Sequence, residues 1–249
     1  MKTAHASLNI ECFIIHLERA RERSHQVEIL ANSLPYKTEV VSAVDGKNET
    51  FDAAPFYRRL TLKPTYPFAL RDAEVATFLS HRKCWQRIVD AGIDAGLILE
   101  DDVVLAAPDF ENALSLAIEN IQQGDVIRFP IKLREKLDYK LAAKHNVQLF
   151  HPTHVGLGAQ VQIVSRRAAE ILLSKTEEFD RPVDTYLQLF WLHGLRILSV
   201  WPNGVSENSV NLGGSLISSK QSLWTKIKHE IKRPIYRVQV HHSARRQRQ

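Results

Sequence analysis

The sequence predicts an α/β fold, in which a mostly parallel sheet is flanked by helices and followed by a basic C-terminal helical tail. Short aliphatic runs that suit strands alternate along the chain with longer segments of helical periodicity, as in doubly wound proteins. The apolar fraction, 44% of 249 residues, is ordinary for a folded protein and argues against disorder. We therefore expect one large domain over residues 1–219 and a basic tail over residues 220–249.

The first part of the chain predicts two strands, a helix and a long loop. An aliphatic run at 12–17 suits a buried strand, and residues 19–34 have an apolar face of helical periodicity. A second strand at 39–44 closes at an Asp-Gly turn. Residues 47–70 are rich in proline and aromatic residues, and a loop of this length is usually functional or mobile.

The next segments continue the alternation. A strongly periodic helix over 72–91 leads into an aliphatic stretch at 96–105, which is typical of a strand buried on both faces of a sheet. Polar and apolar residues alternate over 159–164, which predicts a half-buried strand. The remaining expected elements are helices over 109–123, 166–174 and 183–193 and strands over 125–129 and 196–201.

Three consecutive carboxylates interrupt the aliphatic stretch at 96–105. Glu100, Asp101 and Asp102 would repel one another, and removing them from water would be costly. A bound Mg²⁺-like cation would relieve both costs, and side-chain alternation along a strand would place Glu100 and Asp102 on one face and Asp101 on the other. Ligands of doubly wound proteins bind at the carboxyl ends of strands, where these acids lie. The alternative is a solvated acidic loop or a helix N-cap.

The helix before the acids carries two further polar candidates. Glu74 and His81 are seven residues apart, so they lie nearly in line beside the apolar stripe of the helix. Shielded side chains close to a carboxylate site could position a substrate hydroxyl. The alternative is a local capping or hydrogen-bonding role, with His81 as a structural histidine.

Several protein classes find no support in the sequence. The two cysteines, Cys12 and Cys84, make a disulfide framework or a thiolate zinc site improbable. The chain has no P-loop, dinucleotide-binding, serine-hydrolase or zinc-protease motif. It has no run of about 20 apolar residues and no segment resembling a secretory signal, so the cytoplasm is the expected location.

The C-terminal segment differs from the body in charge. Residues 220–249 hold nine Lys or Arg against one acid, a net charge of +8, whereas the first 219 residues carry −3. A basic amphipathic helix with a Trp suits an anionic membrane surface. The alternative is a helix that docks on the body and is followed by a disordered end. No nucleic-acid partner is expected, because the segment lacks a recognised motif. The apolar face would consist of Leu223, Trp224, Ile227, Ile231, Ile235 and Tyr236.

Residues 71–81, Trp85 and residues 97–103 together resemble glycosyltransferase family 25. This is the lipopolysaccharide and lipooligosaccharide glycosyltransferase family, which collagen galactosyltransferases also resemble. Further similar stretches run from about residue 10 to residue 219, among them 14–19 with Arg23, 43–46, 158–173 and 182–184. The chain departs from the family pattern at Ala76 and Thr77, where Gly and Cys are frequent, and at His16, where Asn is frequent.

The resemblance implies a GT-A-like fold built on a Rossmann-type sheet. It also implies an inverting, metal-dependent transfer of a hexose, often galactose, from a UDP-sugar to a hydroxyl of a lipopolysaccharide, lipooligosaccharide or other glycan. Glu100 and Asp102 would hold Mn²⁺ or Mg²⁺ between the donor phosphates. With a lipid-linked saccharide as acceptor, the basic tail would hold the enzyme at the inner face of the cytoplasmic membrane.

Direct displacement at the sugar also requires a base that takes the proton of the acceptor hydroxyl. Asp184 is the first candidate, because it begins a helix after a proline, where the helix dipole favours an ionised carboxylate. Glu74 and Asp101 are rivals, and the alternative role for Asp184 is that of an N-cap. The implied substrate-binding positions are Leu17, Arg19, Arg23, Asp45 and His81.

Among these positions, Arg19 and Arg23 could neutralise the diphosphate, and Asp45 could accept hydrogen bonds from ribose hydroxyls. Two other classes of protein stay open. One is a non-catalytic binding or scaffold protein with a nucleotide-sugar fold at the membrane. The other is a metal-dependent phosphohydrolase or nucleotidyltransferase, which would cleave the donor without a glycan acceptor.

Overall fold

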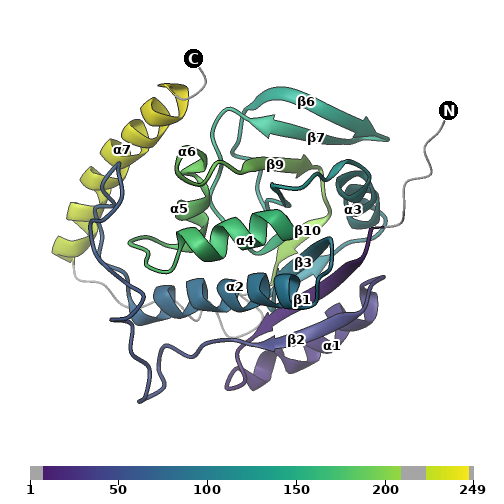
Figure 1. Ribbon diagram of the computed structural model, residues 1–249, viewed down its shortest axis with the longest axis horizontal. Helices are drawn as coiled ribbons and strands as arrows, with labels where there is room; N and C mark the ends of the chain where they lie inside the picture. The colour runs from purple at the N-terminus through teal and green to yellow at the C-terminus, as the bar shows by residue number, and fades with distance from the viewer. Residues whose placement is uncertain (1–7, 209–222, 247–249) are drawn as a thin grey trace.

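A central sheet lies between two layers of helices, as expected from the alternating strands and helices (Figure 1). The computed structural model describes residues 8–208 and 223–246. The strands of the main sheet are β1 (Ile10–His16), β2 (Thr38–Ser42), β3 (Ala95–Glu100), β5 (Asp125–Arg128), β6 (Leu137–Lys144), β7 (Val147–Pro152), β8 (Val161–Ser165) and β9 (Arg196–Trp201).

A second, two-stranded sheet pairs β4 (Val103–Leu105) with β10 (Val205–Glu207) in antiparallel orientation. The helical elements are the 3-10 turn η1 (Arg21–Arg23) and the helices α1 (Ser24–Ser33), α2 (Asp72–Asp90), α3 (Asp109–Asn120), α4 (Arg166–Lys175), α5 (Val183–Leu187), α6 (Phe190–His193) and α7 (Leu223–Arg246).

The strand order of the main sheet is β2-β1-β3-β8-β5-β9-β7-β6. Strands β8 and β7 run against the other strands, which share one direction, so the expectation of a mostly parallel sheet is confirmed. Strand β1 pairs in parallel with β2 on one side and with β3 on the other. The strand order therefore reverses at β1, and the carboxyl ends of β1 and β3 form the crevice where such folds bind ligands.

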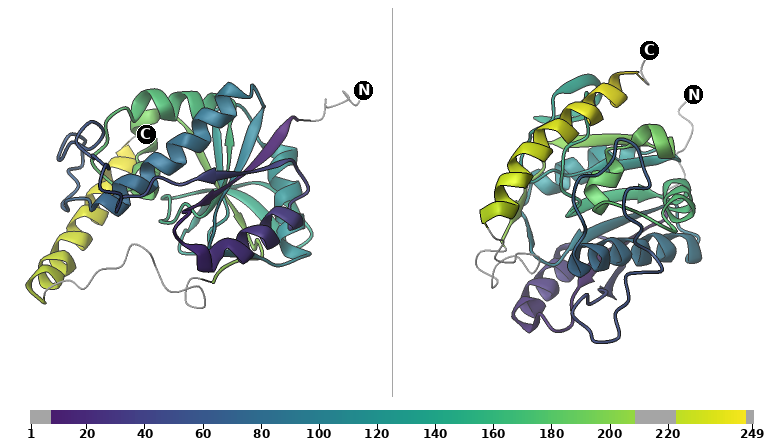
Figure 2. Two further views of the ribbon diagram at one scale, coloured as in Figure 1. Left: turned by 90° about the horizontal axis from the view of Figure 1, so that it is seen from below. Right: turned by 90° about the vertical axis from the view of Figure 1, so that its left-hand side faces the viewer.

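Alternating side chains divide the core into two halves. On β1, Cys12 and Ile14 face α1 and α3, whereas Phe13 and Ile15 face the layer of α2, α4 and α5. Helix α2 packs closely on β3 because residue 96 is a glycine. A Cβ atom at Gly96 would lie only 2.6 Å from Ile88 Cγ1. In Figure 2 the helices lie on both sides of the twisted sheet.

The aliphatic stretch around the acids is two strands, and the expectation of one continuous strand is wrong. Strand β3 ends at Glu100, Asp101 and Asp102 form a turn, and β4 leaves the main sheet to pair with β10. Three adjacent carboxylates cannot all be satisfied inside a sheet, because each needs a partner when it leaves water. Because the chain turns here, the three carboxylates have different neighbours.

Other differences from expectation also have tertiary causes. Strand β8 is buried on both faces rather than half-buried, because it lies between β3 and β5. The helix expected over 183–193 is divided into α5 and α6, and α6 ends at Gly194 in the left-handed conformation. The hairpin of β6 and β7 was not expected from the sequence, because β6 is mostly exposed and carries little apolar pattern.

Helix α7 docks on the body through its C-terminal half. Tyr236 and Val240 are buried against Leu189, Tyr66 and Trp191. The helix lies beside the loop of residues 47–70 (Figure 1). This packing confirms the docked-helix alternative for residues 232–246. The side chains of Leu223, Trp224, Ile227 and Ile231 lie outside the described residues. No helix in the described part of the chain is long and apolar enough to cross a membrane.

Candidate functional site

Asp101 is held in a buried ion pair at the carboxyl ends of β1 and β3. Its side chain is 7% exposed, and its two oxygens lie 2.6 Å from Arg23 Nη1 and 2.8 Å from His16 Nδ1. A carboxylate that two cationic or polar partners hold in this way anchors the turn. These contacts favour a structural role for Asp101, and its candidacy as the base stays a prediction. Arg23 is itself 4% exposed, so its place is against the acids rather than in open solvent.

Asp102 is only partly satisfied by the protein. Its Oδ2 lies 3.2 Å from Arg23 Nη1, whereas its buried Oδ1 has no hydrogen-bond partner among the described residues. Burial, followed by the negative charge of Glu100, raises the pKa of Asp102 from 3.8 to about 6, and Arg23 opposes this rise. A positively charged group at this position would satisfy the free oxygen and relieve the repulsion from Glu100.

Glu100, the last residue of β3, lines the main cavity, and its orientation depends on His81. His81 Nε2 lies 3.3 Å from Glu100 Oε1, and His81 Nδ1 lies 3.2 Å from the side-chain amide of Gln162. If the Gln162 amide donates to Nδ1, the ring proton is on Nε2 and faces Glu100. His81 is completely buried, which favours the positioning of Glu100, and its role as a substrate-binding residue stays a prediction.

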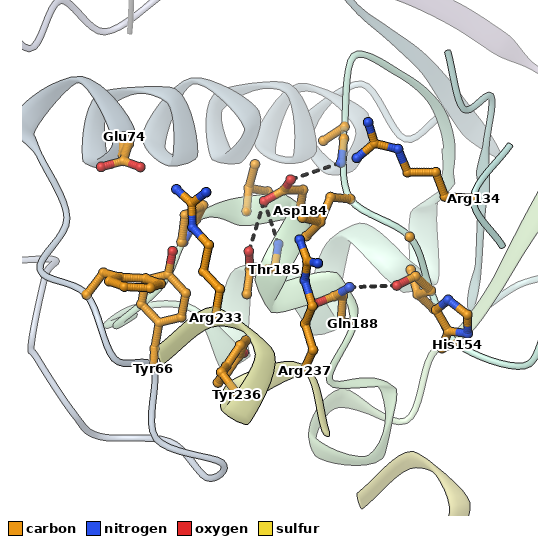
Figure 3. A pocket seen from close by; sticks show the side chains of 18 of the residues that line it. Tyr66, Glu74, Arg134, His154, Asp184, Thr185, Gln188, Arg233, Tyr236 and Arg237 are labelled. Carbon is orange, nitrogen blue, oxygen red and sulfur yellow. Dashed lines mark hydrogen bonds between the residues drawn. The ribbon is translucent and has the colours of Figure 1, made fainter. Parts of the chain in front are cut away.

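The main cavity has a volume of about 740 Å³, which is within the range of small-molecule sites. It is enclosed by the start of α2, the loop of residues 153–160, the start of α5 and one face of α7. Figure 3 shows Glu74, Asp184 and Arg134 directed into this space from three different elements. The cavity therefore joins the carboxyl edge of β3, through Glu100, to the C-terminal helix.

Asp184 lies in the first turn of α5 and faces the cavity (Figure 3). Its Oδ2 accepts a hydrogen bond from the Gly158 amide at 2.9 Å, and its Oδ1 accepts from the Thr185 amide at 2.6 Å and from Thr185 Oγ1 at 3.2 Å. Pro182 is the N-cap of α5, so Asp184 is not the capping residue. The three hydrogen bonds fix the direction in which the carboxylate points.

The loop of residues 153–160, whose Gly158 amide donates to Asp184, is held in place by Arg128. Arg128 is buried and donates to the carbonyl oxygens of Leu157 and Gly158 at 2.9 and 2.7 Å. It also forms an ion pair with the buried carboxylate of Glu135, which accepts a hydrogen bond from the Gly156 amide at 2.5 Å. Gly158 has a φ of 98°, which suits glycine. This network makes the wall beside Asp184 rigid.

Glu74 lines the same cavity but also begins α2. Its Oε2 accepts from the Arg71 backbone amide at 2.9 Å and from Arg71 Nε at 3.1 Å. A carboxylate that bonds back to the residue before a helix stabilises the first turn. The capping alternative for Glu74 is therefore present in the structure, and its candidacy as the base stays a prediction.

The predicted donor-side residues lie at the carboxyl ends of β1 and β2. Arg19 Nε donates to Asp45 Oδ2 at 2.7 Å, and half-buried Leu17 directly follows β1. Burial opposes the change, but the Lys47 amide and then Arg19 lower the pKa of Asp45 below its ordinary value. These residues share the strand edge with the acids but do not line the main cavity. Their contacts with substrate stay a prediction.

Sequence reasoning missed most of the cavity. Helix α7 contributes Arg233, Tyr236, Arg237 and His241, which had been treated as part of a separate tail. His241 contacts His154 of the loop, with ring centroids 4.5 Å apart. A signal was present, because Arg233 and Arg237 are four residues apart and so share one face of the helix with groups that suit a polar site. Spacing alone could not reveal which side of the helix meets the body.

The carboxylates of Glu100 and Asp102 are ligands of the kind that a hard divalent cation prefers, although they are only two. Within residues 8–208 and 223–246, no group of three or more His, Cys, Asp or Glu side chains is placed to hold a metal ion. Two nearby carboxylates, one with an unpartnered buried oxygen, fit an ion whose remaining ligands come from water and substrate phosphates.

The mostly parallel sheet and its acid-bearing edge define a Rossmann-like fold of the glycosyltransferase type. The chain belongs to glycosyltransferase family 25, described as LPS biosynthesis proteins, whose family model matches residues 9–187. The resemblance in the sequence is thereby confirmed. The match includes all three acids and Asp184 and ends before β9, β10 and α7.

Individual relatives are distant. A glycosyltransferase 25 family member of Drosophila melanogaster is 28% identical over 189 residues, which are 72% of this chain and 30% of that protein. Human procollagen galactosyltransferase 2 is 28% identical over 124 residues, 47% of this chain and 19% of that protein. Human inactive glycosyltransferase 25 family member 3 is 29% identical over 120 residues, 45% and 19% of the two chains. The matched segments thus cover less than a third of the length of these relatives.

The raised pKa of Asp102 predicts a pH-dependent penalty in the metal-free protein. Between about pH 4 and pH 6 the unfolded state loses this proton while the folded state retains it, so rising pH lowers the free energy of unfolding. The loss is up to about 3 kcal/mol, because each pKa unit is worth about 1.4 kcal/mol. Urea unfolding in EDTA should show Asp102→Asn gaining stability relative to wild type as pH rises from 4 to 7.

The Glu49→Gln substitution, at an exposed position outside any helix, serves as the control for the loss of one carboxylate elsewhere on the protein. A constant difference between Asp102→Asn and wild type at all pH values would contradict the shifted pKa.

Proposed function

We propose that this protein is an inverting, metal-dependent glycosyltransferase that moves a hexose from a UDP-sugar to a hydroxyl of a glycan. The observation that carries the proposal is that Glu100, from the strand-end acids, and Asp184, the candidate base, line one cavity. The family supports sugar transfer. Galactose is the proposed hexose because one relative is a procollagen galactosyltransferase, and lipopolysaccharide or lipooligosaccharide is the proposed acceptor because of the family's description.

Glu100 and Asp102 are the proposed ligands of Mn²⁺ or Mg²⁺, since Asp102 Oδ1 lacks a protein partner in the described part of the chain. When bound, the ion would stabilise the charge that develops on the leaving nucleoside diphosphate. Around it, Arg23 and His16 hold Asp101, and His81 holds Glu100. Arg23 also lies 3.2 Å from Asp102 Oδ2, so the protein positions both proposed ligand carboxylates.

Asp184 is the proposed base. In an inverting displacement the acceptor oxygen bonds to the anomeric carbon, the bond to the diphosphate breaks, and the hydroxyl proton passes to a carboxylate. The Gly158 amide and Thr185 orient the Asp184 carboxylate toward the cavity. Arg19, Asp45 and Leu17 are proposed to contact the nucleotide, because they lie at the neighbouring strand ends.

A donor-hydrolysis screen tests this function. UDP-, GDP- and CMP-sugars are incubated with purified protein and Mn²⁺, Mg²⁺ or EDTA, and the released nucleotides are identified. We expect slow, metal-dependent release of UDP from one UDP-hexose. Asp102→Ala should abolish it, and Asp184→Asn should lower it about 100-fold while UDP affinity is retained, as for the loss of a general base.

The products and variants separate the alternatives. UMP with hexose 1-phosphate would indicate a phosphohydrolase, because a different bond is cleaved. A large loss in Glu74→Gln, with Asp184→Asn still active, would move the base to Glu74. No release from any donor, with no donor-induced rise in melting temperature, would favour a non-catalytic binding or scaffold protein.

We also propose that the outer face of α7 contacts an anionic membrane at its cytoplasmic side, where a lipid-linked acceptor would be available. Ile235 and Val238 are 54% and 68% exposed, and basic Lys232, Arg245 and Arg246 are exposed on the same helix. Apolar side chains among basic ones suit a headgroup region. Deleting residues 220–249 would not test this, because it would also remove a wall of the cavity.

Substitutions confined to the exposed face test the membrane contact more cleanly. Wild-type protein should sediment with vesicles that contain phosphatidylglycerol, and Ile235→Ser with Val238→Ser should reduce the bound fraction about five-fold, because apolar area is lost from the interface. Equal sedimentation of variant and wild type, or no binding by wild type, would contradict a membrane role for this face.

A further inference from the structure

Helix α7 presents two arginines to the cavity. Arg233 and Arg237 are four residues apart, so they lie on the same face of the helix. Both line the cavity, and Arg134 lines its far side. Figure 3 shows Arg233 and Arg237 extending from α7 toward Asp184 and helix α2. The helix thus brings positive charge to the position where an acceptor hydroxyl would meet the proposed base.

The position of this face is fixed by a buried anchor. Tyr236, which lies between the two arginines in the sequence, is 7% exposed, and its hydroxyl accepts a hydrogen bond from Arg181 Nη1 at 2.8 Å. Arg181 is completely buried and also bonds to Asp180 and to the carbonyl oxygens of Leu62 and Pro64. One guanidinium therefore joins α7, the loop of residues 47–70 and the segment that leads to Asp184.

The donors of the cavity's arginines are available for a ligand in the described part of the chain. Within residues 8–208 and 223–246, no hydrogen bond or ion pair engages Arg134, Arg233 or Arg237, whereas Asp184 and Glu74 both have partners. Arg233 is held over the ring of Phe68, with its Cζ atom 5.8 Å from the centroid. A guanidinium has five donors in a fork that matches an oxyacid group.

His241 lines the cavity, and basic residues of α7 act on it. Burial lowers the pKa of His241, and Arg245 and Arg237 lower it further. His154, in the loop of residues 153–160, packs against His241, and the centroids of the two rings are 4.5 Å apart.

The acceptor, rather than the donor, is the substrate that these arginines would meet. The donor diphosphate belongs with Glu100 and Asp102, whereas the acceptor hydroxyl must reach Asp184, the residue toward which the arginines extend. Helix α7 also lies outside residues 9–187, the part that matches the family model. An element outside the matched part is a suitable place for selectivity particular to this chain.

We propose that Arg233 and Arg237 bind an anionic oxyacid group, a phosphate or a sugar carboxylate, on the acceptor saccharide. The protein would thereby select acidic glycans over neutral ones. This inference rests on the proposed transferase function, because it uses Asp184 to locate the acceptor. Arg134, on the far side of the cavity, would complete the positive surroundings of the same group.

Calorimetric titration with three sugars of one ring tests the proposal. Glucose, glucose 6-phosphate and glucuronate are each added to the full chain in the presence of saturating UDP and Mn²⁺, which occupy the donor position. The two acidic sugars should bind about ten-fold or more tightly than glucose, as expected for charge-assisted contacts. Comparing them identifies whether phosphate or carboxylate is preferred.

Two double variants remove equal charge from α7. Arg233→Gln with Arg237→Gln should lose the preference for acidic sugars, and Lys232→Gln with Arg246→Gln, whose side chains do not line the cavity, should keep it. Arg233→Lys with Arg237→Lys should retain part of the preference, because the charge remains but the fork is lost. Circular dichroism and melting temperature verify that each variant folds.

Three results would overturn the proposal. These are equal binding of glucose and the acidic sugars by wild type, equal losses in the two Gln double variants, and a weakened UDP affinity of Arg233→Gln with Arg237→Gln in place of a weakened sugar affinity. UDP binding to wild type is measured separately. Its absence would count against the transferase function, whereas normal UDP binding without a preference for acidic sugars would count against this inference alone.

Discussion

The buried ion pair between Arg23 and Asp101 is the interaction on which the candidate site depends. It compensates the charge of Asp101, the most deeply buried of the three adjacent carboxylates, where the chain turns at the end of β3. Breaking such a pair from one side typically costs about 3–5 kcal/mol, since a buried charge is left alone. Asp101 is paired, whereas Asp102 and Glu100 remain incompletely neutralised. Their negative charge is therefore available to bind the proposed cation.

The second constraint is the arrangement around Asp184. Arg128 holds the loop that donates to Asp184, and Arg181 holds α7 and the loop of residues 47–70 against the same region. Both guanidinium groups are almost completely buried, so they act as fixed braces rather than substrate contacts. Arg233 and Arg237 of α7 are exposed instead. The buried arginines therefore stabilise the fold, whereas the exposed ones can bind a ligand.

Sequence reasoning identified the α/β class, the strand before the acids and the family, because these depend on local pattern and short motifs. It failed for elements whose position or burial depends on pairing with distant parts of the chain. The exit of β4 toward β10 and the burial of β8 depend on partners far away in the chain. His81 and Asp101 were recognised as important residues, but their burial could not be known from spacing. The docking of α7 was one of two open alternatives, since an amphipathic basic helix suits both a membrane and a protein surface.

A crystal structure with UDP and Mn²⁺, examined by anomalous scattering at the manganese edge, tests the central claim most directly. The claim is that the strand-end acids hold a cation against the donor diphosphate while Arg23 keeps Asp101 out of that role. We predict one manganese peak contacted by the carboxylates of Glu100 and Asp102 and by the UDP phosphates, with Asp101 still paired to Arg23. UDP bound without a peak at these acids, or a peak ligated by Asp101, would contradict the account.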